Sequence, residues 1–254
     1  MTLKIRVIPT LLWKGPGLVK GQMFRNDRRV GPILPAVNVY NRRDVDELIL
    51  LDVNREPITT TNKLQRIQEV GAEVSVPLTI GGGIRTADDA TLILRNGADK
   101  ISLNSSNYVY LELISEIASR HGSQAVVASL DVRRISRNEW KCFSKSGSQQ
   151  ESGDLKSWGV KLAEAGAGEI LFTSIDRDGT MKGYDLDAIH LLSSSVEIPV
   201  IASGGAGKLS DFPEAIEAGA SAVAAASVFH FTQITPSEVR RALSDFGHPV
   251  RQTC

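Results

Sequence analysis

An internal repeat is the feature that most constrains the fold of this chain. The segment PLTIGGGIRTADDATLILRNGADKISLNSS begins at Pro77, and PVIASGGAGKLSDFPEAIEAGASAVAAASV begins at Pro199. At an offset of 122 residues the two prolines coincide, as do two glycines of each glycine cluster, the later Gly-Ala pairs, and Ser105 with Ser227. Self-similarity at a fixed offset predicts a protein built from two similar halves.

Each half alternates short apolar runs with amphipathic stretches, which predicts parallel strands joined by right-handed helical crossovers. Eight strands, four in each half, predict an α/β fold, a (βα)8 TIM barrel made of two half-barrels. An open doubly wound sheet is the alternative, but it does not account for the duplication. No Pro/Ser-rich linker divides the chain, so we expect residues 1–254 to form one domain. The expected strands are Arg6–Leu12, Glu47–Val53, Leu78–Gly81, Lys100–Leu103, Ala125–Asp131, Glu169–Ser174, Val200–Ser203 and Ala222–Ala226. The expected helices are Asn62–Val70, Ala87–Asn96, Tyr108–Arg120, Gly153–Ala165, Leu186–Ser194, Leu209–Ala218 and Pro236–Leu243.

The composition excludes several classes of protein. Lys plus Arg equals Asp plus Glu at 29 each, so no overall field favours nucleic acid or an anionic membrane as a partner. Cys142 and Cys254 are the only cysteines, which excludes a disulfide scaffold and a thiolate metal cluster. The opening residues MTLKIRVIPTLL contain no apolar run long enough for a signal peptide, and no run elsewhere is long enough to cross a bilayer. We therefore expect a cytoplasmic protein.

Glycine-rich turns follow equivalent strands in the two halves. In a barrel these turns lie at the carboxyl ends of the strands, where function is located. Glycines let backbone N–H groups approach an anion, and the start of the following helix adds positive partial charge. Two copies predict two phosphate sites across one barrel mouth, and hence a long ligand with a phosphate at either end. The first cradle consists of Gly82, Gly83, Asn104 and Ser105, and the second of Gly204, Gly205, Ala226 and Ser227.

Alternation along the strands predicts which side chains point into the barrel. Hydroxyl groups recur midway up the inward positions, where they either bond to nearby backbone or line a path for a small polar molecule. Charged residues occupy the strand starts on the same inward positions. They are either solvated end groups or a neutral ring of ion pairs, because unpaired buried charges are costly. The hydroxyls belong to Thr10, Thr79, Ser102, Ser129, Thr173 and Ser203, and the charges to Arg6, Glu47, Lys100 and Glu169.

Several motifs resemble the cyclase subunit of imidazole glycerol phosphate synthase over nearly the whole chain. They are GGGIRTADDA, GADKISLN, GSQAVV, GAGEILFTSIDRDGT, IASGGAGK and AASVFHF. The resemblance implies a (βα)8 barrel that docks a glutaminase on its lower face. Ammonia would then pass through the barrel and react with a ribulosyl-type bisphosphate in histidine synthesis. It also implies that the four inward charges form an ammonia gate, that Asp99 and Gln124 face the glutaminase, and that Gly179 contributes to phosphate binding.

The chain departs from the family at one catalytic position. The family uses an aspartate at the tops of the first and fifth strands as general acid and base. Asp131, in SLDVRR, matches the second aspartate, but the first falls on Leu12 in VIPTLLWKG. Leucine cannot transfer a proton, and a positioned acid or base contributes roughly 10²–10⁴-fold in rate. We therefore expect the cyclase activity to be lost.

Other residues at the barrel mouth match the family more closely. Lys20, in GLVKGQMF, matches a mobile-loop lysine that reaches the substrate, and Asp178 and Asp52 match carboxylates at the mouth. With Asp131, Lys20 and Asp178 are the candidate catalytic residues. The basic segment Arg25–Arg29, RNDRR, is expected to be a loop over an anionic ligand.

Three hypotheses follow. The stretches LLWKGPGLVKGQMF and VGPILPAVNVYN resemble a side branch of the family that is associated with amidation of bacterial surface sugars. The leading hypothesis is an ammonia-channelling partner of a glutaminase that serves a separate sugar amidotransferase in lipopolysaccharide or flagellin-glycan synthesis. The second is an authentic cyclase subunit in histidine biosynthesis, and the third is a phosphate-binding scaffold without transport. We expect no metal, no cofactor and no covalent nucleophile; the expected partners are a glutaminase subunit and a phosphorylated small-molecule ligand.

Overall fold

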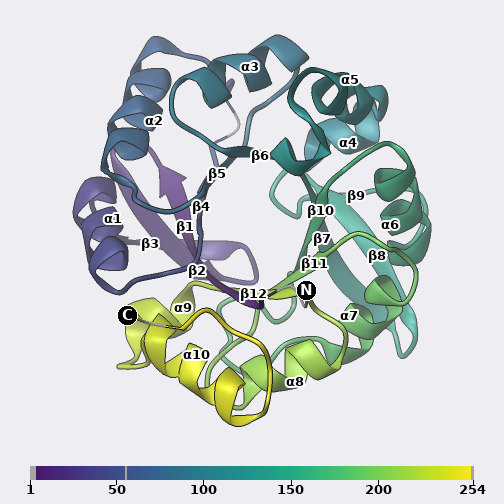
Figure 1. Cartoon of the computed structure of the whole chain (residues 1–254). Coiled ribbons are helices and arrows are strands. Elements are labelled where there is room, and N and C mark those ends of the chain that lie inside the picture. Colours follow the sequence, from purple (N-terminus) through teal and green to yellow (C-terminus); the bar gives the residue numbers. More distant parts are fainter. Residues whose placement is uncertain (1–3, 55, 253–254) are drawn as a thin grey trace.

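Eight parallel strands close into a barrel in the computed structural model, which describes residues 4–54 and 56–252. Each strand pairs with the next around the ring, and β12 pairs with β1 to complete the circle. Figure 1 looks along the barrel and shows the helices as an outer ring. The fold is a (βα)8 TIM barrel, as the repeat predicts. Its strands are β1 (Arg6–Lys14), β4 (Leu48–Asp52), β5 (Leu78–Gly81), β6 (Lys100–Leu103), β7 (Val126–Ser136), β10 (Glu169–Ser174), β11 (Val200–Ser203) and β12 (Ala222–Ala225).

The helices form where apolar residues recur at helical spacing and where a polar residue caps the first turn. Thr86 caps α3 by accepting the N–H of Asp89, and Thr235 caps α10 in the same way. Within the described ranges, no helix is long and apolar enough to cross a membrane. The helices are α1 (Ile33–Arg42), α2 (Thr61–Glu73), α3 (Ala87–Arg95), α4 (Ser105–Val109), α5 (Glu112–His121), α6 (Leu155–Glu164), α7 (Leu186–Ser193), α8 (Asp211–Glu217), α9 (Ser227–Phe231) and α10 (Pro236–Asp245), with a short 3-10 turn, η1 (Ser123–Ala125).

One expected helix is divided in the structure, and helices α1 and α9 are not among the expected ones. The helix predicted over Tyr108–Arg120 is divided into α4 and α5, because Tyr110 adopts an extended conformation with φ −149° and ψ 86°. Helix α1 was not predicted from the sequence, and it contains a proline in its first turn. Pro35 is the third residue of α1, and a proline is tolerated there because the first N–H groups of a helix have no intrahelical partner.

A β-hairpin leaves the top of the first strand of each half. The first consists of β2 (Gly17–Gln22) and β3 (Arg25–Gly31), and the second of β8 (Glu139–Ser144) and β9 (Gln149–Gln150). The prediction of a loop at Arg25–Arg29 is therefore wrong, because these residues pair with β2 as strand β3. We call β2–β3 the lid hairpin and β8–β9 the cover hairpin.

The apolar core has two separate parts. Side chains pointing outward from the strands pack against the helices in one large cluster. A smaller cluster fills the inside of the barrel with side chains that parity predicted to point inward, among them Ile8, Ile49, Val127, Leu171 and Ile201. The inner cluster separates the lower end of the barrel from its upper mouth.

A group of charges locks the seam at which β1 follows β12. One carboxylate oxygen of Asp46 accepts the backbone N–H of Val7 at 2.8 Å. Its other oxygen contacts Arg240 at 3.1 Å and Arg251 at 2.8 Å. Arg240 is 3% exposed, so these contacts tie the end of the chain to its first strand in a largely dry environment.

Candidate functional site

A cavity of about 780 Å³ opens at the carboxyl ends of the barrel strands. We call it the upper cavity. Residues predicted from the sequence to lie at the mouth line it together, including both glycine cradles, Lys20, Asp131, Asp178 and Gly179. Its size suits a small-molecule ligand.

Only glycine fits at the bends of the two cradles. Gly82 and Gly204, which the repeat superposes, have φ of 98° and 90°. A Cβ on Gly82 would lie 2.0 Å from the carbonyl oxygen of Asp52, and one on Gly205 would lie 2.1 Å from that of Gly183. The close approach of backbone to backbone that the sequence predicted is therefore present on both sides of the mouth.

The two cradles differ in the state of their serine. The Ser227 hydroxyl of the second cradle is buried and has no hydrogen-bond partner among the described residues. In the first cradle, Ser105 Oγ accepts the backbone N–H of Lys145 at 3.0 Å, from the tip of the cover hairpin. The sequence analysis did not single out Lys145, although the 122-residue offset that reveals the repeat also aligns it with Met23 in the lid hairpin.

Asp131 lies half-buried at the mouth, near the middle of β7. Burial raises its pKa to about 7, and the negative charge of Asp178 adds to the effect. A carboxyl group with that pKa both gives and takes protons near neutral pH. Asp131 is therefore suited to proton transfer.

Leu12 faces the same upper cavity, at the position where the family has its first aspartate. It pairs with Leu51 on β4 and Val19 on β2, so its surroundings are apolar. The neighbouring Trp13 is 4% exposed and donates its indole N–H to the carbonyl of Gly15 at 2.7 Å. Neither residue supplies a titratable group on this side of the mouth.

The lid hairpin is closed over the second half of the mouth. Lys20, which is 2% exposed, donates to both carboxylate oxygens of Asp178, at 2.7 and 2.8 Å. The backbone N–H of Met23 donates to the carbonyl of Asp178 at 2.8 Å. These contacts bring Lys20 to the cavity and neutralise its charge with that of Asp178.

Asp52 has a structural set of contacts. Its Oδ2 atom lies 2.7 Å from the ammonium of Lys63 in an ion pair, and its Oδ1 atom accepts two N–H groups of Asn54. A buried carboxylate neutralised in this way holds the turn after β4, although the residue also lines the upper cavity.

At the opposite end of the barrel the four inward charges form a closed ring of ion pairs, which we call the charged ring. Arg6 reaches Glu47 and Glu169, each at 2.7 Å. Lys100 reaches the same two carboxylates, at 3.1 and 2.9 Å. The sequence left open whether these charges are solvated end groups or a ring of ion pairs. In the structure they form the ring of ion pairs, and each cation lies between both anions.

Electrostatics within the charged ring favour the ionised forms. Burial acts to raise the pKa of Glu169, but its hydrogen bond to Arg6 and the charges of Arg6 and Lys100 outweigh burial and leave the pKa below its ordinary value. Burial likewise acts to lower the pKa of Arg6, and Glu169 and Glu47 outweigh it. Arg6 and Glu169 are therefore held in their ionised forms at neutral pH.

Hydroxyl side chains lead from the charged ring to the upper cavity. Thr79 donates to Glu47 at 3.0 Å and is fully buried. The Thr10 hydroxyl is buried and has no partner among the described residues. The hydroxyl residues that also line the floor of the upper cavity are Thr10, Ser102, Ser129, Thr173 and Ser203.

The two residues expected to face a glutaminase lie at the lower end of the barrel. Asp99 immediately precedes Lys100 of the charged ring, and its carboxylate accepts the N–H of Leu78 at 2.8 Å. Gln124 lies in η1, just before β7, and its amide donates to the carbonyl of His121 at 3.2 Å. Both side chains are exposed, so the structure leaves them accessible at this face.

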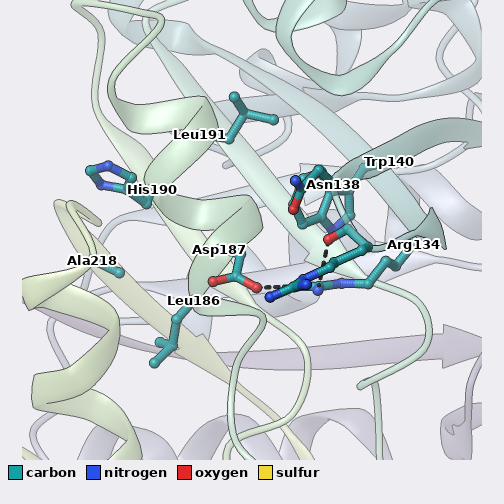
Figure 2. Close-up of a pocket in the computed structure, with 9 residues that line it drawn as sticks. Arg134, Asn138, Trp140, Leu186, Asp187, His190, Leu191 and Ala218 are labelled. Carbon is teal, nitrogen blue, oxygen red and sulfur yellow. Dashed lines mark hydrogen bonds and ion pairs between the residues drawn. The ribbon is translucent and has the colours of Figure 1, made fainter.

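A second cavity, of about 620 Å³, lies outside the barrel between α7 and the turn that joins β7 to β8. Figure 2 shows Arg134 at its edge, paired with Asp187 and lying against Trp140. Arg134 also pairs with Asp185 at 2.7 Å, so its charge is already neutralised. None of the residues predicted from the sequence to be functional lines this cavity.

Comparisons with known proteins match this arrangement to one family. A profile described as "Histidine biosynthesis protein" covers residues 6–235. The chain belongs to that family. It is 46% identical to a protein of Streptomyces avermitilis, 44% to one of Streptomyces coelicolor and 40% to one of Corynebacterium glutamicum. Each alignment covers 99% of this chain and 100% of the relative.

All three relatives are named imidazole glycerol phosphate synthase subunit HisF. These names agree with the resemblance to a HisF-type cyclase subunit. None of the three points to amidation of surface sugars, so the narrower branch suggested by LLWKGPGLVKGQMF finds no support in them.

Proposed function

We propose that this barrel is a HisF-type subunit that accepts ammonia from a glutaminase and uses it in the upper cavity. The observation that carries the proposal is the arrangement along one axis of a balanced charged ring, hydroxyl side chains and a cavity with two glycine cradles. Ammonia is small and polar, and hydroxyl groups offer it hydrogen bonds in a barrel otherwise filled with aliphatic side chains. The exposed Asp99 and Gln124 belong to the face on which a glutaminase subunit would dock.

The first candidate reaction is that of imidazole glycerol phosphate synthase in histidine biosynthesis, which the names of the relatives favour. In this proposal the two cradles hold the phosphates of a ribulosyl-type bisphosphate. Asp131, with its pKa near 7, moves protons during ring formation. Lys20 and Asp178 form the closed side of the mouth and hold the ligand away from water.

The second candidate is ammonia delivery without ring formation, for example to a sugar amidotransferase. Leu12 is the observation that favours it, because an aliphatic side chain stands on β1 where the family has its first acid or base. The charged ring, the hydroxyl side chains and the upper cavity are all present. The loss of proton transfer at Leu12 is therefore compatible with retained transport of ammonia through the barrel. In this alternative the bisphosphate site remains from a cyclase ancestor without being used in catalysis. The ammonia leaves the barrel and reacts with an acceptor bound to another protein.

One experiment separates the two candidates. The purified chain is given the bisphosphate precursor of the synthase reaction and excess ammonium salt, and turnover is followed by the loss of precursor absorbance. Ammonium removes the need for a glutaminase, so only the chemistry of the barrel is measured. Leu12→Asp and Asp131→Asn variants are measured beside the wild type.

The first candidate predicts ammonium-dependent turnover by the wild type that Asp131→Asn abolishes. Leu12→Asp then raises the rate, by up to about 10²-fold if the restored carboxylate acts as general acid or base. Absence of wild-type turnover excludes the first candidate. Glutamine hydrolysis by an added glutaminase subunit tests the shared part of the proposal: it should rise when the barrel is present and fall back with Asp99→Ala.

A further inference from the structure

The two cradles differ in the cations beside them. Four cationic side chains line the upper cavity: Lys14, Lys20, Arg85 and Lys145. Asp27 neutralises Lys14 at 2.9 Å, and Asp178 neutralises Lys20. Arg85 and Lys145 are exposed, and in the described ranges only their backbone groups, not their side chains, have a hydrogen-bond or ion-pair partner. Both flank the first cradle, so the free positive charge of the cavity is concentrated on one side.

Arg85 is held next to the first cradle by its backbone. Its N–H donates to the carboxylate of Asp89 at 2.9 Å, and the hydroxyl of Ser106 donates to the carbonyl of Ile84. These contacts fix the start of the Arg85 side chain between the turn after β5 and the turn after β6. The guanidinium itself is left free to reach an anion in the cradle.

The repeat places Gly207 at the position of Arg85 in the second half. The backbone contact is the same, since the N–H of Gly207 donates to Asp211 at 2.8 Å. A Cβ on Gly207 would lie 2.3 Å from the carbonyl oxygen of Met181. The second cradle therefore has no room for a cationic side chain at this position.

Lys145 reaches the first cradle from the cover hairpin. Its N–H donates to Ser105, and the amide of Asn104 donates to the carbonyl of Phe143 at 3.4 Å. Lys145 and Ser146 have φ of 50° and 55°, a left-handed conformation that costs a non-glycine residue about 1 kcal/mol or more. A glycine or asparagine would relieve this cost, so the turn retains a lysine at an unfavourable backbone position directly over the cradle.

The equivalent hairpin tip over the second half has no charge. Met23 and Phe24, which the 122-residue offset aligns with Lys145 and Ser146, also have positive φ, of 51° and 61°. The tip of the lid hairpin also docks through a backbone N–H, which Met23 donates to the carbonyl of Asp178 rather than to a cradle serine, and it carries apolar side chains. Each half of the barrel thus sends a hairpin to the other half. Lys20 of the lid hairpin is paired with Asp178, and Arg28 lies over the ring of Phe231 at 4.1 Å. Only the cover hairpin therefore brings a cavity-lining cation without a carboxylate partner in the described ranges.

We propose that Arg85 and Lys145 clamp the phosphate bound in the first cradle and so fix the direction in which a two-phosphate ligand lies across the mouth. The inference rests on the proposed function for the two-phosphate ligand. Arginine offers a planar fork to phosphate oxygens and lysine a mobile point charge, and both strengthen binding of a dianion over backbone N–H groups alone. The second cradle relies on backbone N–H groups and the unpartnered Ser227 hydroxyl. It therefore binds the other phosphate of the ligand less tightly.

The test is a titration of the isotope-labelled full chain with inorganic phosphate, followed by two-dimensional NMR. The backbone amides of Gly83 and Gly205 report on the first and second cradles separately, so each cradle gives its own dissociation constant in one experiment. The variants are Arg85→Ala, Lys145→Ala and the double variant. Arg95→Ala and Lys156→Ala are matched controls, because both residues are exposed and lie outside the cavity lining.

We expect wild-type phosphate to bind the first cradle more tightly than the second. Each single variant should weaken the first cradle by about fivefold and the double variant by tenfold or more, as expected for partly exposed ion pairs. The second cradle should remain within about twofold, and the controls should change neither constant. Rising salt should weaken the first cradle more steeply than the second.

Two results overturn the clamp. If the double variant leaves the first cradle unchanged, or if the second cradle is the tighter one in the wild type, the assignment is wrong while the two-phosphate ligand survives. If neither cradle binds phosphate in the wild type, the clamp fails together with the bisphosphate ligand of the proposed function. The turnover assay with ammonium is independent of these constants, so the two failures are distinguished.

Discussion

Replacing Lys100 with methionine tests whether the charged ring is a coupled unit. Methionine keeps the length of the side chain and removes its charge, which leaves the carboxylates of Glu47 and Glu169 sharing Arg6 alone. Lys100 makes two ion pairs, at 2.9 and 3.1 Å, and its side chain is 15% exposed. Removing one partner of a buried ion pair costs about 3–5 kcal/mol, and we expect about 3 kcal/mol because of the residual exposure.

A loss of that size is readily measured. For a chain of this length, 1 kcal/mol corresponds to about 2 °C in Tm, so Lys100→Met should melt about 6 °C below the wild type at pH 7 in a calorimetric scan. Lys156→Met, on the exposed surface of α6, is the matched control and should stay within about 0.5 kcal/mol. The deficit should depend on pH. Since the pKa of Glu169 lies below its ordinary value of 4.5, the stabilisation that Glu169 contributes is present above pH 4.5 and is lost as pH falls further.

A second substitution makes the test decisive. Lys100→Met with Glu169→Gln removes one cation and one anion, and leaves the Arg6–Glu47 pair at 2.7 Å. If the four charges act as a unit, the double variant is more stable than the sum of the single losses by about 1–3 kcal/mol. Losses that add within about 0.5 kcal/mol refute the reasoning, because the ion pairs would then be independent solvated contacts.

Three further predictions concern the barrel interior and the mouth. Asp131→Asn should abolish ammonium-dependent turnover yet raise Tm at pH 8. Because the pKa of Asp131 is raised to about 7, wild-type stability falls between about pH 4 and pH 7 as the carboxyl ionises. A pH series of melting curves shows whether this fall is absent from the variant. Thr79→Val removes the 3.0 Å hydrogen bond to Glu47 and should cost about 1–2 kcal/mol in urea unfolding, while an unchanged midpoint would mean that the bond contributes nothing. Gly82→Ala would bring a Cβ to 2.0 Å from the carbonyl of Asp52 at a φ of 98°; it should lower Tm and weaken phosphate binding at the first cradle, and normal binding would contradict the backbone role assigned to this turn.

The repeat and the strand periodicity were sufficient to predict the barrel. Four strands, such as Leu78–Gly81 and Glu169–Ser174, have the predicted bounds, because each is a short apolar run closed by a glycine, serine or charged residue. Parity was also sufficient to place the charged ring and the hydroxyls on the inside, since side chains alternate strictly along a strand. These features depend on local sequence and on the repeat that relates the two halves of the chain.

Features that depend on contacts between distant segments were not predicted. The basic stretch Arg25–Arg29 gives no apolar alternation, and it becomes a strand only because β2 offers it a partner. The pairing of Asp52 with Lys63 and the docking of Lys145 on Ser105 have no local signal either. The contacts that the two hairpins make at the mouth are therefore visible only once the chain is folded.

The seam at Asp46 has a consequence for how the protein is made. Arg240 and Arg251, which lock Asp46 and through it the start of β1, follow it in the sequence by 194 and 205 residues. A ribosome adding about 5–20 residues per second takes roughly 10–40 s to supply them. Until β12 (Ala222–Ala225) is made, shortly before them, β1 has no partner on that side and one edge of the growing sheet stays open. The nascent chain thus carries an exposed strand edge for most of its synthesis, and the step that removes this edge also fixes Val7 and, next to it, Arg6 of the charged ring.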